Sequence, residues 1–377
     1  MTKPFKETIY ITRPIMPDFN ELENRIQYLY ESRMLTNLGP YHQKLEVKLR
    51  DFLKVDHLSL FNNATIGLIT ALKALDLPFG SEVITTPFTF AATPHSIVWN
   101  GLKPVFCDIE PDTMTIDPDK IPDLITPQTS AILGVHVYGF PCKVDAISEI
   151  ASEYNLKIIY DGAHAFTTEI DGKSICDYGD ITVLSFHATK LFHTLEGGAL
   201  VYIDPNLNSK VKNLRNFGIQ DEFTVTDIGI NGKLNEIQSI FGLLNLELVN
   251  NEQNKRKKIS DVYHQRLSQN DNILIPKMPD NTTNSFQYFP IIIKEHRDIV
   301  YDTLRENNIH ARKYFYPPCT DYDSYKELGN RNTLPVTYSR ADQVLCLPFY
   351  GELGEDNANI ICDVIIDTLE NNNETGD

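Results

Sequence analysis

The sequence predicts an α/β fold, in which a mainly parallel sheet is flanked by helices and followed by a smaller α+β region. Two observations carry this prediction. Short apolar runs typical of strands alternate with helical patterns through the first half of the chain, and units of this length connect parallel strands by right-handed crossovers. A stretch rich in Asp, Asn and Pro, at 270–284, then separates this alternation from a more mixed pattern.

The first elements are helices. Apolar positions recur at helical spacing over 18–35, and this pattern ends at the turn signal Thr36-Asn37-Leu38-Gly39-Pro40. A second amphipathic helix follows, with its buried stripe running from Leu45 to Leu53. The helix that begins near Thr65 is apolar almost all round, so we expect it to be buried.

The sheet is predicted from short apolar runs, at 57–61, 83–86, 104–107, 131–137, 157–160, 181–184 and, as an antiparallel partner, 199–203. Helices are expected between them at 91–99 and 144–154. A long helix from about 233 to 267 is expected to link a large domain, 1–248, to a small C-terminal domain, 249–377. In the small domain we expect a strand at 287–293, helices at 298–307 and 356–369, and a frayed tail at 371–377.

Composition limits the classes of function. Of the 377 residues, 42% are hydrophobic and 23% are charged, which is ordinary for a soluble globular protein. The formal net charge of -17 argues against a nucleic-acid partner, since such proteins carry a basic surface. No apolar run is long enough for a membrane span or a signal peptide. The six scattered cysteines include no C-x-x-C pair, so we expect reduced buried thiols, no metal site and a cytoplasmic protein.

Reactive side chains follow the strand predicted at 181–184. The sequence Ser185-Phe186-His187-Ala188-Thr189-Lys190 comes directly after this strand, and Glu196-Gly197-Gly198 follows it. A strand that ends here brings these side chains to the carboxyl edge of the sheet, where open α/β sheets bind ligands. We therefore expect Lys190 to be a functional amine that holds a cofactor as a Schiff base.

Two other strand ends meet the same edge. Thr65 lies where the free N–H groups of a helix N-terminus can bind a phosphate, and Asp161 ends the strand at 157–160. Taken singly, Thr65 is better explained as an N-cap, Asp161 as a cap or ion-pair member, and His164 as a structural histidine. Phe90, taken singly, is a core residue. Together with Lys190 they form the set that pyridoxal 5'-phosphate requires: an amine, an acid at the ring nitrogen, an aromatic face and phosphate donors.

These motifs resemble a known family. S-F-H-x-T-K followed by E-G-G, with D-x-A-H upstream, is similar to the DegT-like nucleotide-sugar aminotransferases, a branch of the fold-type I pyridoxal-phosphate enzymes. The similarity extends from Leu35 to Phe349. It implies the fold-type I aminotransferase architecture and a homodimer with two shared active sites. Within the family, S-F-H-A-T-K resembles the branch that aminates C4 of a nucleotide-linked 4-keto-6-deoxy hexose.

The resemblance also implies roles for individual residues. Lys190 and Asp161 are expected to be catalytic: the lysine carries the cofactor and moves a proton, and the carboxylate faces the ring nitrogen. Further contacts to the cofactor are expected from Ala64, Thr65, Phe90, His164, Ser185, His187 and, in the neighbouring subunit, Asn231. Substrate contacts are expected from Thr36, Asn37, Lys233, Tyr314 and Tyr316. The chain departs from the family pattern at Lys233, where Arg is common, and at Pro318-Cys319-Thr320, which replaces a frequent Leu-His pair.

The reaction implied by the resemblance is a transamination. L-glutamate donates nitrogen to dTDP-4-keto-6-deoxy-D-glucose, and the product, dTDP-4-amino-4,6-dideoxy-D-glucose, serves bacterial surface polysaccharide such as O-antigen. Alternatives within the family are amination at C3 and a GDP- or UDP-linked sugar. A sugar dehydratase of the related class has His in place of Lys190. A catalytically silent scaffold or regulator is disfavoured because Asp161, Lys190 and Asn231 are all present.

Overall fold

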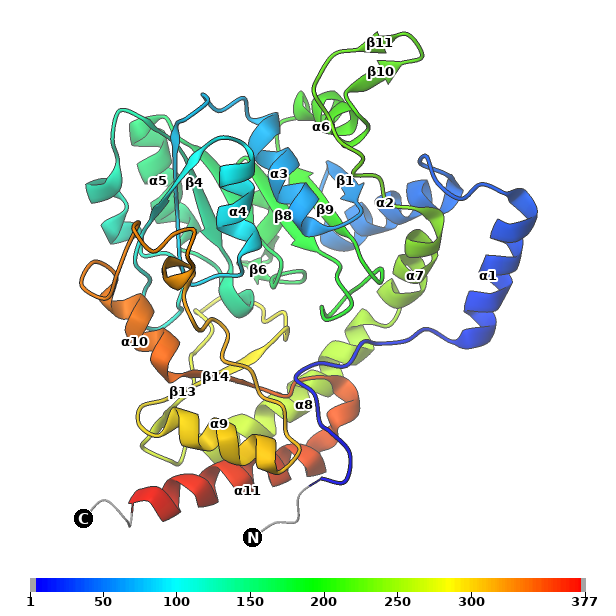
Figure 1. The fold of residues 1–377 in the computed structure, drawn as a ribbon. Helices are drawn as coiled ribbons and strands as arrows, with labels where there is room; N and C mark the ends of the chain where they lie inside the picture. The colour runs from blue at the N-terminus through cyan, green and yellow to red at the C-terminus, as the bar shows by residue number, and fades with distance from the viewer. Residues whose placement is uncertain (1–4, 374–377) are drawn as a thin grey trace.

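Seven strands form the central sheet of the computed structural model, which describes residues 5–373 (Figure 1). Their order is β1-β9-β8-β5-β4-β2-β3, and the neighbours from β8 to β3 pair in parallel, whereas β9 is antiparallel to both β1 and β8. The predicted α/β fold with a mainly parallel sheet is thus confirmed. The strands are β1 (Leu58–Phe61), β2 (Glu82–Thr85), β3 (Lys103–Phe106), β4 (Thr129–Val135), β5 (Lys157–Asp161), β8 (Ile181–Ser185) and β9 (Gly198–Tyr202).

Alternate side chains of these strands supply two apolar cores, one on each face of the sheet. On β5, Ile158 and Tyr160 belong to one core and Ile159 to the other. Because both faces are covered by helices, the strands are apolar throughout, which is the pattern that predicted them. The first core is closed by α2 (Pro40–Leu53), α5 (Val144–Tyr154) and α7 (Glu236–Leu246), and the second by α3 (Ala64–Ala74), α4 (Ala92–Trp99) and α6 (Leu207–Arg215). Helix α1 (Phe19–Ser32) packs outside α7.

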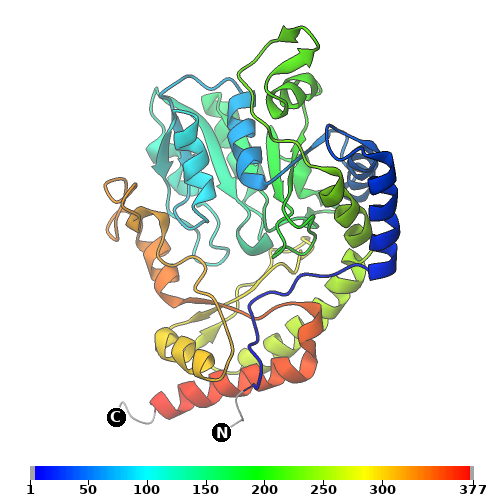
Figure 2. The ribbon, with the colours of Figure 1, turned by 45° about the vertical axis from the view of Figure 1, so that its right-hand side comes forward.

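A second, antiparallel sheet lies below the central one in Figure 2 and consists of β12 (Ile273–Leu274), β13 (Phe289–Ile293) and β14 (Val344–Leu347). On β13, Phe289, Ile291 and Ile293 pack in a third core with three helices, and Ile292 points back toward the second core. The helices of this C-terminal part are α8 (Val249–Leu267), α9 (Arg297–Glu306), α10 (Pro335–Gln343) and α11 (Gly354–Asn373). The expected frayed tail at 371–377 is helical to Asn373, and the rest of it lies outside the described residues.

The long helix predicted over 233–267 is instead two helices, and this part of the prediction is wrong. The first of them, α7, begins at Glu236, because Asn235 forms a reciprocal capping box with Gln238. At Leu248 the backbone N–H bonds to the C=O of Asn245, three residues back instead of four, and the chain turns from α7 into α8. The Asn245 side chain donates to the C=O of His193, so the end of α7 is fixed against the loop that carries Lys190.

Short elements were missed by the apolar-run criterion. They are β6 (Glu169–Ile170), β7 (Lys173–Ser174), β10 (Ile219–Asp221) and β11 (Thr224–Val225), together with α6, α10, β12 and β14. The strands β10 and β11 form a hairpin that projects from the top of the molecule in Figure 1, and we call residues 216–230 the arm. All six cysteines are buried and unpaired, as predicted. Among residues 5–373, none of the helices is long and apolar enough to cross a membrane.

The N-terminal segment crosses from the C-terminal part to the central part of the molecule (Figure 2). Ile9 pairs with Ile309 in a parallel bridge, and the C=O of Ile11 accepts the N–H of Phe349. Further along, the C=O of Ile15 accepts a hydrogen bond from His193 Nε2 (2.7 Å). The segment that precedes α1 therefore contacts both the C-terminal part of the molecule and the loop between β8 and β9.

Candidate active site

The carboxyl ends of the central strands surround a cavity of about 300 Å³. Strands β5 and β8 end at this cavity, and helix α3 begins beside it. Crossover connections make the strands parallel, so their carboxyl ends lie at the same edge of the sheet. The predicted site residues that line it are Ala64, Thr65, Phe90, Asp161, His164, Ser185, His187, Lys190 and Tyr314. Residues from three separate strand ends are thus brought together, as the sequence pattern predicted.

The Asp161 carboxylate is buried and held at both oxygens. Oδ2 accepts the hydroxyl of Thr93 (2.8 Å), and Oδ1 accepts the N–H of Ala163 (3.1 Å). The Thr93 hydroxyl is itself bonded to that of Thr89 (2.9 Å), which lies just before α4. Burial raises the pKa of Asp161, whereas these two hydrogen bonds and the charge of Lys190 act in the opposite direction. The carboxylate is therefore oriented toward the cavity by α4 and by its own loop.

Lys190 lies in a tight loop between β8 and β9. Its N–H donates to the C=O of His187 (2.9 Å), and its ammonium lies 5.6 Å from the ring centroid of Tyr288. Burial lowers the pKa of the Lys190 amine to about 8, although the charge of Asp161 opposes this change. An amine with this pKa is partly neutral near physiological pH and can act as a nucleophile or base.

The N-terminus of α3 forms the wall opposite these two groups. Its N-cap is Asn63, whose side chain accepts the N–H of Ile66 (2.8 Å), so the interpretation of Thr65 as the N-cap is wrong. The N–H groups of Ala64 and Thr65, in the first helical turn, have no partner within the helix and are available to bind an anion. A Cβ at Gly198 would lie 2.8 Å from the backbone N of Ala64, which explains why β9 begins with glycine beside this turn.

His164 and Phe90 lie on other walls of the cavity. The Nδ1 atom of His164 accepts the backbone N–H of Tyr138 (3.1 Å), which leaves the proton on Nε2. Burial lowers the pKa of His164 well below its ordinary value, so the ring is a neutral donor at physiological pH. Phe90 is 64% exposed and so does not have the core role considered for it, whereas the neighbouring Phe88 is fully buried. An exposed aromatic ring at a cavity is available for stacking.

His187 and Glu196 form a pair at the mouth of the cavity. The Thr189 N–H donates to His187 Nδ1 (3.2 Å), and His187 Nε2 lies 3.4 Å from a carboxylate oxygen of Glu196. Both side chains are exposed. The sequence pattern marks Glu196 only as part of the E-G-G motif and predicts no contact for it, whereas in the structure it lines the cavity.

Five predicted residues do not line this cavity: Thr36, Asn37, Asn231, Lys233 and Tyr316. The Lys233 ammonium donates to Oδ1 of Asn231 and to Oδ1 of Asn216, both at 2.8 Å, and lies 4.9 Å from the ring centroid of Phe217. Lys233 therefore orients Asn231 at the base of the arm, with the amide nitrogen of Asn231 turned away from the ammonium.

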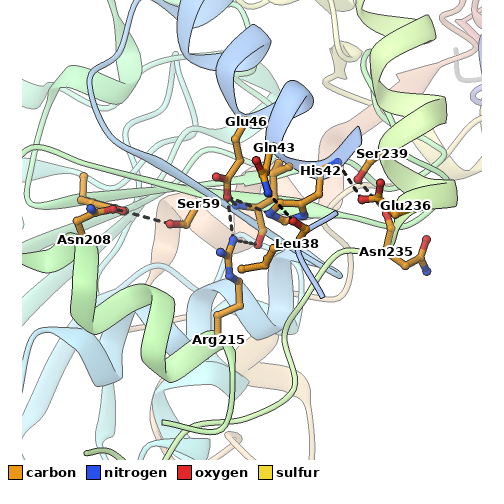
Figure 3. A network of polar contacts seen from close by, with 12 residues as sticks. Leu38, His42, Gln43, Glu46, Ser59, Asn208, Arg215, Asn235, Glu236 and Ser239 are labelled. Atoms are coloured by element: carbon orange, nitrogen blue, oxygen red, sulfur yellow. Dashed lines mark hydrogen bonds and ion pairs between the residues drawn. The ribbon is translucent and has the colours of Figure 1, made fainter. Parts of the chain in front are cut away.

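A buried polar network supports the loops that carry these outer residues (Figure 3). Glu46 of α2 accepts hydrogen bonds from Arg215 (2.9 Å) and from the N–H of Leu60 (3.1 Å). Burial alone would raise the pKa of Glu46, but the hydrogen bond from His42 and the charge of Arg215 lower it to about 2. Arg215 also donates to the C=O of Leu60 (2.7 Å), so the base of the arm is tied to β1.

Sequence reasoning missed several residues of the site. Thr93 holds the Asp161 carboxylate, and Tyr288 and Phe315 line the cavity from the C-terminal part of the chain. Thr93 lies in the first turn of a predicted helix, and nothing in the local pattern marked it as a partner of Asp161. No local pattern marked Tyr288, because its role depends on how the second sheet packs against the first.

The donor set around the cavity fits pyridoxal 5'-phosphate. The cavity is lined by a partly buried amine, a buried carboxylate, an exposed aromatic ring and a helix N-terminus. These are the groups that the aldehyde, the ring nitrogen, the ring face and the phosphate of this cofactor require.

Comparisons with known proteins agree with this chemistry. The model of the DegT/DnrJ/EryC1/StrS aminotransferase family matches residues 18–366. A dTDP-4-amino-4,6-dideoxy-D-glucose transaminase of Shigella dysenteriae is 44% identical over 373 residues, covering 98% of this chain and 99% of that protein. The crystal structure of DesI in the presence of its TDP-sugar product has a TM-score of 0.91 and 33% identity, covering 97% of this chain and 93% of DesI. The structure of NtdA from Bacillus subtilis with bound cofactor PMP has a TM-score of 0.85 and 25% identity, covering 93% and 82% of the two chains.

Proposed function

The chain belongs to the DegT/DnrJ/EryC1/StrS aminotransferase family, and on this premise we propose that it transfers nitrogen from L-glutamate to dTDP-4-keto-6-deoxy-D-glucose. The product is dTDP-4-amino-4,6-dideoxy-D-glucose, a precursor for surface polysaccharide such as the O-antigen of lipopolysaccharide. The observation that carries the proposal is the convergence of Lys190 and Asp161 on one cavity beside the N-terminus of α3. The identity of 44% to a transaminase with this product name supports the choice of sugar.

The proposed cofactor is pyridoxal 5'-phosphate, whose ring, when bound, accepts the electron pair of the carbon that loses or gains a proton. Asp161 holds a proton on the ring nitrogen, and Thr93 and Ala163 keep that carboxylate oriented. The backbone of Ala64 and Thr65 and the hydroxyl of Ser185 would bind the cofactor's phosphate. The neutral His164 would donate its Nε2–H to the phenolic oxygen, and Phe90 would cover one face of the ring.

Lys190 supplies the proton transfers in both halves of the reaction. In the first half it removes the proton from Cα of L-glutamate, and in the second it delivers a proton to C4 of the hexose. A positioned acid–base group of this kind contributes about 10²–10⁴-fold to the rate. Its lowered pKa suits both directions, because the amine exchanges its proton readily near neutral pH.

The proposed active unit is a homodimer with two shared sites. The arm supports this proposal, because Phe223 and Ile228 are 89% and 88% exposed, which is unusual for large apolar side chains in a monomer. Asn231 at the base of the arm lies outside the cavity of its own chain and is oriented by Lys233. In the dimer it donates to the phosphate bound by the neighbouring subunit.

The chain is further proposed to divide into a cofactor-binding domain, 1–248, and a C-terminal domain, 249–377. The separate apolar core formed by residues 259–369 supports this boundary, as does the turn between α7 and α8. The six buried, unpaired thiols support a reducing compartment such as the cytoplasm.

The test combines product identification with replacement of the lysine. Purified protein is incubated with L-glutamate, pyridoxal phosphate and 4-keto or 3-keto hexoses linked to dTDP, GDP or UDP, and the amino-sugar is identified by mass spectrometry and NMR. We expect a 4-amino product from the dTDP sugar. Lys190→Ala should abolish turnover and the cofactor that borohydride fixes to the peptide, whereas Lys157→Ala, at an exposed lysine paired with Asp180, should keep both.

Two outcomes would contradict the proposal at different levels. A 3-amino product, or a product only from a GDP- or UDP-linked sugar, would exclude the proposed substrate and leave the transaminase chemistry intact. Normal turnover by Lys190→Ala would exclude the mechanism itself.

A further inference from the structure

The loop that carries Lys190 is held from outside by a residue of the C-terminal part. Gln287 precedes β13 and is buried. Its Oε1 accepts the N–H of Leu191 (2.7 Å), and its Nε2 donates to the C=O of Thr189 (3.1 Å). A single side-chain amide thus binds the peptide groups on both sides of Lys190.

This pair of bonds restricts the lysine more than either bond would alone. An amide side chain has its donor and acceptor in one plane, so making both bonds fixes the separation and orientation of the two peptide groups. The Leu191 side chain is buried, which limits the access of water to these bonds. The backbone that carries the Lys190 side chain is therefore fixed by contacts that do not involve the ammonium.

The neighbours of Gln287 contact the same site. The Ser285 hydroxyl donates to the C=O of His164 (2.7 Å), and the Tyr288 ring lies beside the Lys190 ammonium. The segment 285–288 is in turn held by the buried Arg256 of α8, which donates to the C=O of Phe286 (3.1 Å). The position of the lysine thus depends on the packing of the C-terminal sheet against the central one.

We propose that Gln287 is a positioning residue for the proton transfers of Lys190, acting through the peptide groups of Thr189 and Leu191. This inference rests on the proposed transaminase function and extends it, because it assigns a role to a residue that does not line the cavity. Loss of the amide allows the lysine loop to shift, and misplacement of a reacting group by about 1 Å can cost on the order of 10²-fold in rate.

The test uses two variants of Gln287 and a matched control. Gln287→Leu removes both bonds. Gln287→Glu keeps the acceptor for Leu191 but, when ionised, places a second oxygen against the C=O of Thr189; when protonated, it can donate as glutamine does. Gln253→Leu is the control, since it removes a glutamine hydrogen bond to the hydroxyl of Thr167 (2.7 Å) away from the lysine loop.

Three measurements are made on the cofactor-loaded protein: kcat and KM, the pH dependence of kcat, and hydrogen exchange of the Leu191 amide. We expect kcat to fall about 10²-fold in Gln287→Leu with little change in KM, and the Leu191 amide to exchange faster. In Gln287→Glu, kcat should recover toward acid pH relative to wild type as the new carboxyl is protonated. Gln253→Leu should match wild type in all three.

The inference is overturned if folded Gln287→Leu keeps wild-type kcat, if Gln287→Glu keeps wild-type kcat at every pH measured, or if kcat falls while exchange at Leu191 is unchanged. Failure of Gln287→Leu to fold leaves the decision to Gln287→Glu, which has the same size as the native side chain. If wild-type protein itself attaches no pyridoxal phosphate at Lys190, the proposed function fails, and that result is distinct from normal behaviour of the Gln287 variants.

Discussion

At the scale of single residues, burial changes the chemistry of the lysine more than any one contact does. The Lys190 amine is partly buried, and burial disfavours its charged form, so its pKa falls from the ordinary value of 10.5 to about 8. The Asp161 charge opposes this effect without cancelling it. Lys157, by contrast, is exposed to solvent and forms an ion pair with Asp180.

This lowered pKa predicts how the apoprotein captures pyridoxal phosphate at different pH values. Only the neutral amine reacts, so the capture rate should rise about tenfold per pH unit below about pH 8 and then level off. A surface lysine would continue to gain reactivity at higher pH. The rate is followed by absorbance after mixing, with Nα-acetyl-lysine as the reference that removes ionisations of the aldehyde itself. A profile for the protein that parallels the reference up to pH values near 10 would contradict the assigned pKa.

The sequence identified the residues that form local motifs at strand ends and missed those that act across the fold. Lys190 and Asp161 each follow an apolar run, so both were predicted as groups at the sheet edge. Tyr288 and Gln287 reach the lysine loop only because β13 packs beneath it, and nothing in their immediate neighbourhood signals this. Lys233 was expected to contact substrate, but in the structure it orients Asn231.

At the scale of secondary-structure elements, helix α2 begins without a cap of its own. Its N-cap position is Gly39, and the buried carboxylate of Glu236, from α7, accepts the N–H groups of Tyr41 (2.8 Å) and His42 (3.0 Å) instead. A Cβ at Gly39 would lie 2.7 Å from the Glu236 carboxyl carbon, so glycine is required for this approach. The N-terminus of α2 is thus capped by a side chain of α7, a helix far away in the sequence.

Replacing Glu236 should therefore destabilise the fold near the turn at 36–39. Glu236→Ala leaves two backbone donors without their acceptor, and we expect the free energy of unfolding to fall by about 1–2 kcal/mol. The free energy of unfolding is measured by urea denaturation, and its dependence on urea concentration (the m-value) should be the same in the variant and in wild type. Glu247→Ala, at an exposed glutamate just after α7, is the control and should change stability little. Equal stability of Glu236→Ala and wild type would contradict the role of Glu236 in capping α2.

Element boundaries that depend on capping or tertiary contact were the least predictable. The helix over 144–154 and the strand ending at Asp161 follow directly from their apolar patterns. The turn between α7 and α8 does not, because it depends on the contact between Asn245 and the loop at His193. The strands of the arm are exposed and lack the alternation that marks a half-buried strand.

At the scale of the whole molecule, the arm projects away from both cores and carries exposed apolar side chains (Figure 1). Its base is tightly packed: Gly218 has a φ of +76°, and a Cβ there would lie 1.8 Å from the carbonyl oxygen of Asp227. The base of the arm is therefore fixed, and its tip is exposed to solvent. In the proposed homodimer we expect this tip to contact the neighbouring subunit.

Charged substitutions at the tip should separate the proposed dimer. Phe223→Asp places a carboxylate at the centre of this apolar contact, and we expect the sedimentation coefficient to fall to that of a monomer, together with most of the activity. Leu274→Asp, at a half-exposed leucine of the C-terminal sheet, should leave both unchanged. A monomeric wild-type protein with full activity would contradict the shared-site dimer.

The overall architecture was predictable because it depends on a repeated pattern, and the site was predictable in part because that pattern determines where strand ends meet. Alternating strands and helices imply parallel pairing, and parallel pairing brings Asp161 and Lys190 to one edge. The contribution of the C-terminal part to the cavity, through Tyr288, Tyr314 and Phe315, required the packing of two sheets, which no local pattern encodes.

The N-terminal segment has a consequence for how the chain is made. Ile9 pairs with Ile309, so the segment around Ile9 cannot take its final place until residue 309 has been synthesised. The central sheet, whose last strand β9 ends at Tyr202, can assemble before that. The C=O of Ile15 can accept its hydrogen bond from His193 as soon as the lysine loop has been made, so the segment can be anchored first to the central part and only later to the C-terminal part.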